Sequence, residues 1–367
     1  MMWKIHQTYN WKELEDKFSW VHDMQNVPQD PIYHAEGNVA IHTQMVMAEL
    51  QQLPEFKELD EQNQHILMAA ALMHDIEKRS TTVLESDGRI SSANHAKNGE
   101  HSVREILYRE IETPFAIRES IAKLIRYHGQ PIWLILKDNP EKKLAGISLE
   151  VDTKMLAILA KADVLGRTGA EQSEFLDRID LFKELCVNLD CWGKPRHFKS
   201  DIAKYHYFTH NSYIDYVPFQ KNSFEVVLLS ALPGSGKDWY IENNLSNLPE
   251  ISLDNLRRKY KASPTDQKMT GRIVQEAKEL ARQFLRKKQS FVWNATNLSS
   301  SLRKTLIGLF AEYGAHVKII YLEVPYKKLL LQNQNRKYPL PQAVLDKMIK
   351  KWDVPQQWEA HNVVYKL

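Results

Sequence analysis

Cysteine is almost absent from this chain, since Cys186 and Cys191 are its only two among 367 residues. Two thiols are too few for a disulfide framework or for a complete cysteine zinc site, so we expect free thiols. No run approaches the roughly 20 apolar residues of a membrane-spanning helix. The first residues, MMWKIHQTYN, lack the apolar core of a signal peptide. These absences predict a cytoplasmic protein with no membrane partner.

A large excess of charge of one sign is also missing. Lys and Arg total 49 against 46 Asp and Glu, a formal net charge of +3 at pH 7. Any nucleic-acid binding therefore has to come from local basic segments such as LRRKYK (256–261) and LRKKQ (285–289). Hydrophobic residues make up 43% of the chain, which is typical of globular domains, and the length allows two of them.

The pattern of apolar residues changes once along the chain. From about residue 8 to residue 205, apolar residues recur at helical spacing, as in VAIHTQMVMAEL and KMLAILAKADVL. After residues 209–224, short runs rich in β-branched residues and leucine, such as EVVLLSAL and HVKIIYLEV, alternate with charged amphipathic segments. We therefore predict an all-α domain over residues 1–217 and an α/β domain with a parallel sheet over residues 218–367.

A histidine–aspartate pair, His74 and Asp75, ends the apolar run ILMAAALM in the first domain. Neighbouring positions on a helix differ by about 100°, so both side chains can reach one ion from the same wall of a pocket. An imidazole nitrogen and a carboxylate oxygen together suit divalent ions such as Mn, Fe, Co, Ni or Zn. Two ligands do not complete such a site, and the further candidates are His42, His95, His128 and Asp163.

This order of residues resembles the HD phosphohydrolase superfamily, in which a first histidine precedes the His-Asp pair and a distant aspartate follows it. The resemblance covers roughly residues 25–185, with Glu77 in place of the glycine usual in the family motif. Members with two metals add two histidines between the pair and the last aspartate, so one or two ions are implied. The ligands implied by the resemblance are His42, His74, Asp75 and Asp163, with His95 and His128 added for a second ion.

The chemistry implied by this resemblance is hydrolysis of a phosphoester. A bound divalent ion lowers the pKa of its water toward about 7, which provides a nucleophile at neutral pH. Lys78 and Arg79 directly follow the motif and are expected to meet a substrate phosphate. His34 is either a substrate-side group or a near-surface residue.

A second motif, ALPGSGKD at residues 231–238, follows the first predicted strand of the α/β domain. It matches the phosphate-binding loop G-x-x-x-x-G-K-[ST], in which backbone amides cradle phosphates and the lysine reaches the β- and γ-phosphates. Ala231 replaces the first glycine. Asp238 replaces the hydroxyl that touches Mg²⁺, although a carboxylate can itself hold Mg²⁺. We expect ATP or another NTP, with Mg²⁺, to be bound by Pro233, Gly234, Ser235, Gly236, Lys237 and Asp238.

The rest of this domain favours a kinase over a translocating ATPase. The segment SFVWN ends in Asn294, where an ATPase needs an Asp-Glu pair. The segment SLDNLRR resembles the acceptor site of 5′-OH polynucleotide kinases, which implies that Asp254 is the general base and that Arg257 grips an acceptor phosphate.

The same resemblance extends over residues 225–350. It implies that NATNLSSSLR lies near the acceptor and that LLLQNQNRKYPLP forms a lid over the nucleotide. In the lid, Gln332 stands in place of one of two usual arginines, and Arg336 is retained to stabilise the transferred phosphoryl group together with Lys237. The acceptor contacts implied in the first segment are Thr296, Asn297 and Arg303.

Together the two halves resemble the HD-Pnk end-healing enzymes over nearly the whole chain. The resemblance implies hydrolysis of 2′,3′-cyclic phosphate or 3′-phosphate ends and NTP-dependent phosphorylation of 5′-OH ends, in RNA or DNA. A separate ligase would then seal the healed ends. Two alternatives stay open. One is a signalling enzyme that cleaves free nucleotides and phosphorylates a small molecule; the other is a regulatory module in which Asp238 has disabled transfer and ATP only signals.

Overall fold

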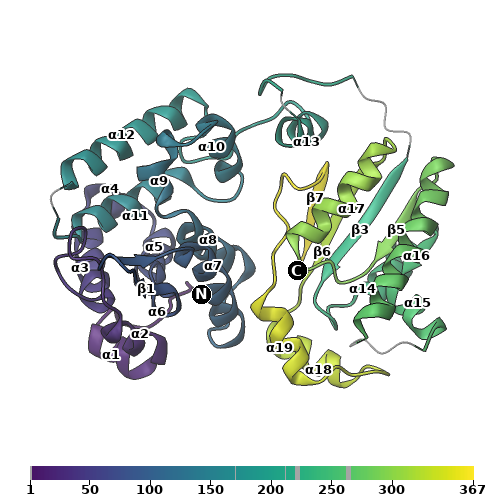
Figure 1. Ribbon diagram of the computed structural model, residues 1–367, viewed down its shortest axis with the longest axis horizontal. Coiled ribbons are helices and arrows are strands. Elements are labelled where there is room, and N and C mark those ends of the chain that lie inside the picture. The colour runs from purple at the N-terminus through teal and green to yellow at the C-terminus, as the bar shows by residue number, and fades with distance from the viewer. Residues whose placement is uncertain (1, 170, 211, 220–223, 262–265) are drawn as a thin grey trace. The chain divides into compact units, whose positions relative to one another are not determined.

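The computed structural model describes residues 2–169, 171–210, 212–219, 224–261 and 266–367, which divide into two compact units (Figure 1). The first unit is Met1–His197 and the second is Phe198–Leu367. The division lies earlier than the expected one after residue 217. The difference comes from helix α13 (Asp201–Thr209), which packs into the second unit.

Helix α13 is tied to the end of the chain by two contacts. The Tyr205 ring stacks on the His361 ring with 4.1 Å between centroids, and the Asn362 amide donates a hydrogen bond to the Asp201 carboxylate (2.9 Å). The sequence pattern assigns α13 to the helical half of the chain. Helical spacing predicts a helix but does not show which unit its apolar face packs against.

The first unit is helical, as expected, apart from one small hairpin. Strands β1 (Thr82–Leu84) and β2 (Ile90–Ser92) pair antiparallel, an addition that the expected all-α domain did not contain. Each strand has only three residues, too few to show an alternating pattern in the sequence. The helices are α1 (Trp11–Lys17), α2 (Ser19–Asp23), η1 (Met24–Asn26), α3 (Val39–Gln52), α4 (Pro54–Lys57), α5 (Glu61–Met73), α6 (Lys78–Thr81), α7 (His95–Arg109), α8 (Phe115–Tyr127), α9 (Gln130–Trp133), η2 (Leu134–Leu136), α10 (Pro140–Ser148), α11 (Thr153–Leu165) and α12 (Gln172–Asn188).

Three capped helices form the centre of the first unit. Asn38, Asp60 and Asp152 each accept backbone N–H groups at the start of α3, α5 and α11, which satisfies donors that a helix leaves unpaired. From Ile66 to Met73 every residue of α5 is buried. A helix that is apolar on all sides belongs in the interior, so residues at its end are held in a rigid, water-poor setting.

The second unit contains a five-stranded parallel sheet in the order β4–β5–β3–β6–β7. Its first long strand, β3, is buried from Val226 to Ala231, as expected for a parallel strand covered on both faces. This confirms the predicted α/β fold class. The strands are β3 (Glu225–Ala231), β4 (Glu250–Ser252), β5 (Phe291–Asn294), β6 (His316–Leu322) and β7 (Asn362–Lys366); besides α13, the helices are α14 (Lys237–Asn244), α15 (Leu253–Lys259), α16 (Gln267–Arg286), α17 (Ser300–Glu312), α18 (Tyr326–Gln334) and α19 (Gln342–Lys350).

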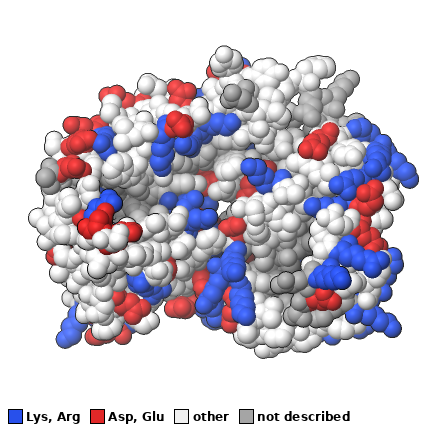
Figure 2. Space-filling model, viewed as in Figure 1, with Lys and Arg blue, Asp and Glu red and all other residues white. Residues whose placement is uncertain are grey.

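Two features of the surface bear on binding partners. Among the described residues, no helix has both the length and the apolar character needed to cross a membrane. Figure 2 shows Lys and Arg side chains gathered over α15 and α16, with Asp and Glu interspersed. The two basic segments found in the sequence lie there, and Arg258, Lys259, Arg286 and Lys287 are all exposed.

Candidate active sites

The metal candidates of the first unit are brought together from five places in the helical core. His42 lies on α3, His74 and Asp75 follow α5, and Asp163 lies on α11. The other two, His95 and His128, lie at the start of α7 and just after α8. All but His95 are buried. Segments up to 121 residues apart in the chain therefore converge on one polar cluster.

The ligand atoms form two groups that meet at Asp75. In the first group, the Asp163 Oδ1 atom lies 3.0 Å from His42 Nε2 and 3.9 Å from His74 Nε2. In the second group, His95 Nε2 lies 3.4 Å from both Asp75 Oδ1 and His128 Nε2. The other Asp75 oxygen lies 3.2 Å from His74 Nε2. In each group the three ligand atoms lie within 4.8 Å of one another.

Each of these histidines has its Nδ1 atom engaged by backbone, which turns Nε2 toward the cluster. A hydrogen bond on one ring nitrogen fixes the orientation and tautomer of a metal-binding histidine. The Nδ1 contacts are His42 to Gly166 O (3.2 Å), His74 to Ala71 O (2.8 Å), His95 to Ser92 O (2.7 Å) and His128 to Ile125 O (2.8 Å).

The cluster fits a divalent metal. His74 Nε2 and Asp75 Oδ1 are buried and have no hydrogen-bond partner among the described residues. Buried polar atoms without a partner are rare in folded proteins, because each one costs free energy. Imidazole nitrogens mixed with carboxylate oxygens are typical ligands of divalent transition metals. A bound ion would satisfy both atoms.

The electrostatics of Asp75 and His128 favour the protonation states that bind metal. At His74, in contrast, burial is outweighed by Asp75 and Asp163, which raise its pKa in the absence of an ion. Burial alone would raise the pKa of Asp75, but His74 and Lys78 hold it well below its usual value. Burial, with His95 and His74 nearby, lowers the pKa of His128 to about 3. A charged carboxylate and a neutral imidazole are the forms that bind metal ions.

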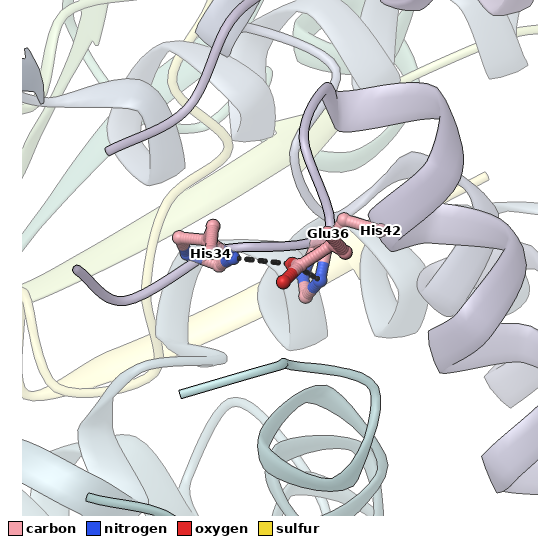
Figure 3. A group of neighbouring side chains, drawn as sticks. All are labelled: His34, Glu36 and His42. Carbon is pink, nitrogen blue, oxygen red and sulfur yellow. Dashed lines mark hydrogen bonds and ion pairs between the residues drawn. The ribbon is translucent and has the colours of Figure 1, made fainter. Parts of the chain in front are cut away.

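A carboxylate that the sequence analysis did not single out, Glu36, supports His42. Figure 3 shows its side chain between the rings of His34 and His42, whose Nδ1 atoms lie 2.8 Å and 3.0 Å from Glu36 Oε1. The Thr168 N–H donates to the other oxygen (2.9 Å). Burial would raise the pKa of Glu36, but the hydrogen bonds from His42 and Thr168 lower it to about 2. His34 is thereby placed beside the metal ligands, on the wall of a cavity.

Two cations contact the ligand carboxylates. Lys78 Nζ lies 2.7 Å from Asp75 Oδ2, and the Arg167 guanidinium is hydrogen-bonded to Asp163. Lys78 also donates to Gln29 Oε1 (2.6 Å). All three of these side chains line a cavity of about 450 Å³ that reaches Asp75, His95 and His128. Arg79, in contrast, pairs with Asp23 at the surface (3.0 Å) and does not line this cavity.

In the second unit the phosphate-binding loop joins β3 to α14. Gly234 and Gly236 have φ angles of +91° and +86°, which favour glycine. A Cβ atom on Gly234 would lie 3.5 Å from Asn333 N and Leu329 O, so α18 packs closely against this part of the loop. Ala231, in place of the first glycine of the motif, is the last residue of β3, where a side chain causes no strain.

Lys237 lies at the start of α14 with its side chain half-buried. Burial lowers its pKa to about 8, while the nearby carboxylates of Asp238 and Asp254 act in the opposite direction. Asp254 is on the first turn of α15 and forms an ion pair with Arg257 (2.6 Å). The acid and the arginine expected at the acceptor site are thus held together near the P-loop lysine.

Asp238 is held at the carboxyl edge of the sheet. Its Oδ1 atom accepts a hydrogen bond from the Asn294 amide (3.0 Å), and the same amide donates to Glu250 (2.7 Å). In parallel sheets this edge is where ligands bind. The other carboxylate oxygen of Asp238 takes no part in this hydrogen bond. This carboxylate is the group expected to hold Mg²⁺.

The segment expected to form the lid carries polar atoms that lack partners among the described residues. Gln332 Oε1 and Arg336 Nη1 are buried without a hydrogen-bond partner among the described residues, and the same holds for Ser235 Oγ in the loop. Arg336 lies close enough to Lys237 to oppose its positive charge. Cations and orphaned polar groups around a glycine loop fit an anionic ligand such as a nucleotide phosphate.

Two of the three residues expected near the acceptor after β5 have structural partners instead. Arg303 is fully buried, and its guanidinium donates to both oxygens of Glu359 (2.6 and 2.8 Å). The buried Asn297 amide donates to Leu229 O (2.6 Å). Thr296 is half-buried, and its carbonyl accepts the Ala231 N–H (3.0 Å). Asp254, Arg257 and Thr296 thus stay acceptor-side candidates, while Arg303 and Asn297 hold the fold.

Comparisons with known proteins give a separate family match for each half of the chain. Residues 38–168 match the family model of the HD domain, and residues 226–355 match the model of an AAA domain. A 138-residue stretch is 25% identical to L-seryl-tRNA(Sec) kinase of Methanococcus maripaludis, covering 35% of this chain and 53% of that protein. The chain thus spans about half the length of this curated relative.

Proposed function

We propose that this chain, which joins an HD hydrolase domain to a P-loop kinase domain, heals both ends of a nucleic-acid break. The HD domain would hydrolyse a 2′,3′-cyclic phosphate or 3′-phosphate end, and the kinase domain would phosphorylate a 5′-OH end. The observation that carries the proposal is that one chain holds both a His/Asp cluster suited to divalent metal and a glycine-rich phosphate-binding loop. In the proposal, the first site hydrolyses a phosphoester at one end, and the second adds a phosphate to the other.

In the HD domain, the histidines and aspartates of the cluster would hold one or two divalent ions, with Asp75 shared between the two ligand groups. When bound, such an ion supplies an activated water and neutralises charge on the phosphoryl oxygens. The chain's own residues orient the substrate. Lys78 lines the cavity beside Asp75 and would attract the phosphate, while Arg167 keeps Asp163 in place.

In the kinase domain, catalysis would consist mainly of positioning and charge neutralisation. Burial lowers the pKa of Lys237, and the negative charge of a bound polyphosphate would raise this pKa again. Asp254 would accept the proton of the attacking hydroxyl, and Arg257 beside it would hold an acceptor phosphate. Arg336 would contact the transferred phosphoryl group. Asp238 would hold Mg²⁺, directly or through water.

A nucleic-acid acceptor is favoured over a small molecule by two observations. The matched relative is named as a kinase of L-seryl-tRNA(Sec), so its named substrate contains RNA. In this chain the acceptor-side helix α15 continues into the exposed cations Arg258 and Lys259. Cations at the edge of an acceptor site suit a phosphate backbone, and we expect such binding to weaken as salt rises.

The test uses an RNA oligonucleotide with a 5′-OH and a 2′,3′-cyclic phosphate, incubated with ATP, Mg²⁺ and Mn²⁺ or Co²⁺. Both ends are identified by mass. We expect Lys237→Ala to lose 5′ phosphorylation and keep 3′ hydrolysis, and His74→Ala/Asp75→Ala to do the reverse. If the wild type left both ends untouched while hydrolysing free nucleotides, end healing would be wrong and the signalling alternative would replace it.

The chain offers matched controls for both variants. His22 and Asp23 are a second adjacent His-Asp pair, with side chains 62% and 51% exposed, so His22→Ala/Asp23→Ala repeats the chemical change outside the cluster. Lys350→Ala removes an exposed lysine at the end of α19. Both controls are expected to retain both reactions.

A further inference from the structure

The cavity beside the histidine–aspartate cluster is lined by two chemically different sets of side chains. Asp75, His95, His128 and Lys78 are named the first wall, and the aromatic side chains Tyr33, Trp133 and Phe175 the aromatic wall. Its volume of about 450 Å³ lies within the range of roughly 300–1,000 Å³ typical of small-molecule sites. A phosphate needs only the first wall, so the aromatic wall calls for another part of the substrate.

Trp133 is the most prominent group of the aromatic wall. Its ring has the Arg178 guanidinium above it at 5.0 Å from the centroid, and it meets the Phe175 ring at 5.6 Å with an interplanar angle of 65°. Trp133 is nevertheless 42% exposed, and Tyr33 on the same wall is 44% exposed. A large indole that is braced by its neighbours and still open to a cavity is suited to stacking on a flat ligand.

A second feature of the cavity also points to a ligand. Gln29 lines it and is 6% exposed, yet its Nε2 group has no hydrogen-bond partner among the described residues. The Oε1 atom of the same amide accepts from Lys78, so the orphaned donor lies beside the cation that contacts Asp75. A buried N–H donor without a partner costs free energy unless a ligand oxygen accepts its hydrogen bond.

We propose that this cavity binds the terminal nucleoside of the substrate, with its base stacked on Trp133 and a ribose or phosphate oxygen accepting from Gln29 Nε2. The inference rests on the proposed hydrolysis of nucleic-acid ends and adds the subsite that recognises the last base. The phosphate lies at the Lys78 end of the cavity, and the base lies at the Trp133 end. Stacking on one indole does not distinguish the four bases strongly, so any terminal base is accepted.

The test compares two RNA oligonucleotides that end in a ribose 2′,3′-cyclic phosphate, one with its terminal base and one with an abasic terminal ribose. The variant Trp133→Leu keeps apolar volume against Phe175 but removes the aromatic face. For the base-bearing end we expect KM to rise about 5- to 100-fold, the effect of losing one stacking contact. KM for the abasic end is expected to stay at the wild-type value. Trp133→Phe is expected to recover most of the difference.

Each possible result supports or overturns the proposed base subsite. An equal rise in KM for both ends, or no rise for either, would overturn the base subsite. Trp239→Leu is the matched control, because Trp239 is 65% exposed, belongs to the other domain and is not expected to alter hydrolysis. Metal content and melting temperature are measured for each variant, and Trp133→Met, which also removes the aromatic face, carries the test if Trp133→Leu does not fold. A wild type that hydrolyses neither end would refute the proposed function itself, which is a different result.

Discussion

Glu36 is a carboxylate that contacts His42, one of the candidate metal ligands. Its carboxylate accepts from both His34 and His42, and it is anchored by the Thr168 N–H. We expect Glu36→Gln to weaken Mn²⁺ binding and hydrolysis by about 10- to 100-fold, the usual effect of losing a carboxylate behind a histidine ligand. Titration with Mn²⁺ and the hydrolysis rate at saturating Mn²⁺ measure the two effects.

The exposed Glu58 supplies the control, since Glu58→Gln makes the same chemical change at the surface. The role assigned to Glu36 fails if Glu36→Gln keeps Mn²⁺ affinity and hydrolysis within about twofold of Glu58→Gln, well below the loss expected for such a carboxylate. Phosphorylation of 5′-OH ends is expected to be equal in both variants.

Asp254 allows a corresponding prediction in the kinase domain. General-base catalysis contributes about 10² to 10⁴ in rate, so we expect Asp254→Asn to reduce kcat for 5′ phosphorylation by that factor. The KM for ATP is expected to change little, because the proposed role of this carboxylate is to accept the proton of the acceptor hydroxyl. Steady-state kinetics with varied ATP and varied 5′-OH RNA separate these quantities. A large rise in the KM for ATP with kcat unchanged would instead make Asp254 a nucleotide contact.

At the scale of single residues, the motif predicted which side chains would lie together, while their role as metal ligands stays a prediction. His74 and Asp75 stand next to each other at the end of a buried helix, and the structure brings the other expected ligands to them. Glu36 and Gln29 were missed because their roles depend on partners that only the folded chain supplies. Arg303 was predicted to contact the acceptor. Its ion pair with Glu359, 56 residues further along the chain, could not be seen in the sequence.

At the scale of elements, α13 and the segment before β7 form one structural unit through His361. This side chain is 1% exposed, and its Nδ1 atom accepts a hydrogen bond from the Val317 N–H (3.1 Å) on β6. Burial and the neighbouring His316 lower the pKa of His361 to about 4. A protonated ring could not accept from Val317, so the neutral form holds this corner of the sheet.

A lowered pKa of a histidine gives a definite sign for the effect of pH on stability. The unfolded chain binds a proton at His361 near pH 6.5, whereas the folded chain binds it near pH 4. Stability is therefore full above pH 6.5 and falls as pH decreases from 6.5 to 4, by up to about 3 kcal/mol. Hydrogen exchange of the peptide containing Val317 should show protection decreasing over this window. In His361→Gln, measured at the same pH values, that decrease should be absent.

Some of the elements could be predicted from sequence patterns, and others could not. The buried strands of the parallel sheet were predictable because they are continuous apolar runs, and β3 is buried from Val226 to Ala231. The hairpin of β1 and β2 was not predictable, since its exposed Val83 and Leu84 resemble neither a buried strand nor an amphipathic one. For α13, amphipathicity predicts a helix but not the domain that receives it.

At the scale of the whole molecule, the two sites differ in the metals that their ligands prefer. The HD cluster offers four imidazole nitrogens beside two carboxylates, from His42, His74, His95, His128, Asp75 and Asp163. Mg²⁺ prefers oxygen ligands and keeps much of its water, so a nitrogen-rich cluster selects against it. The kinase site offers the Asp238 carboxylate and the phosphates of the nucleotide, which suit Mg²⁺.

This difference predicts that metal exchange separates the two activities in one intact chain. After treatment with a chelator and dialysis, we expect Mg²⁺ alone to restore 5′ phosphorylation fully and to leave 3′ hydrolysis near background. Subsequent Mn²⁺ or Co²⁺ should restore hydrolysis without changing the phosphorylation rate, because the ligands of each site choose their own ion. Both ends are read by mass on one RNA, and bound metal is measured at each step. Recovery of hydrolysis with Mg²⁺ alone would contradict this prediction. It would mean that a cluster with four imidazole ligands binds an ion that prefers oxygen ligands.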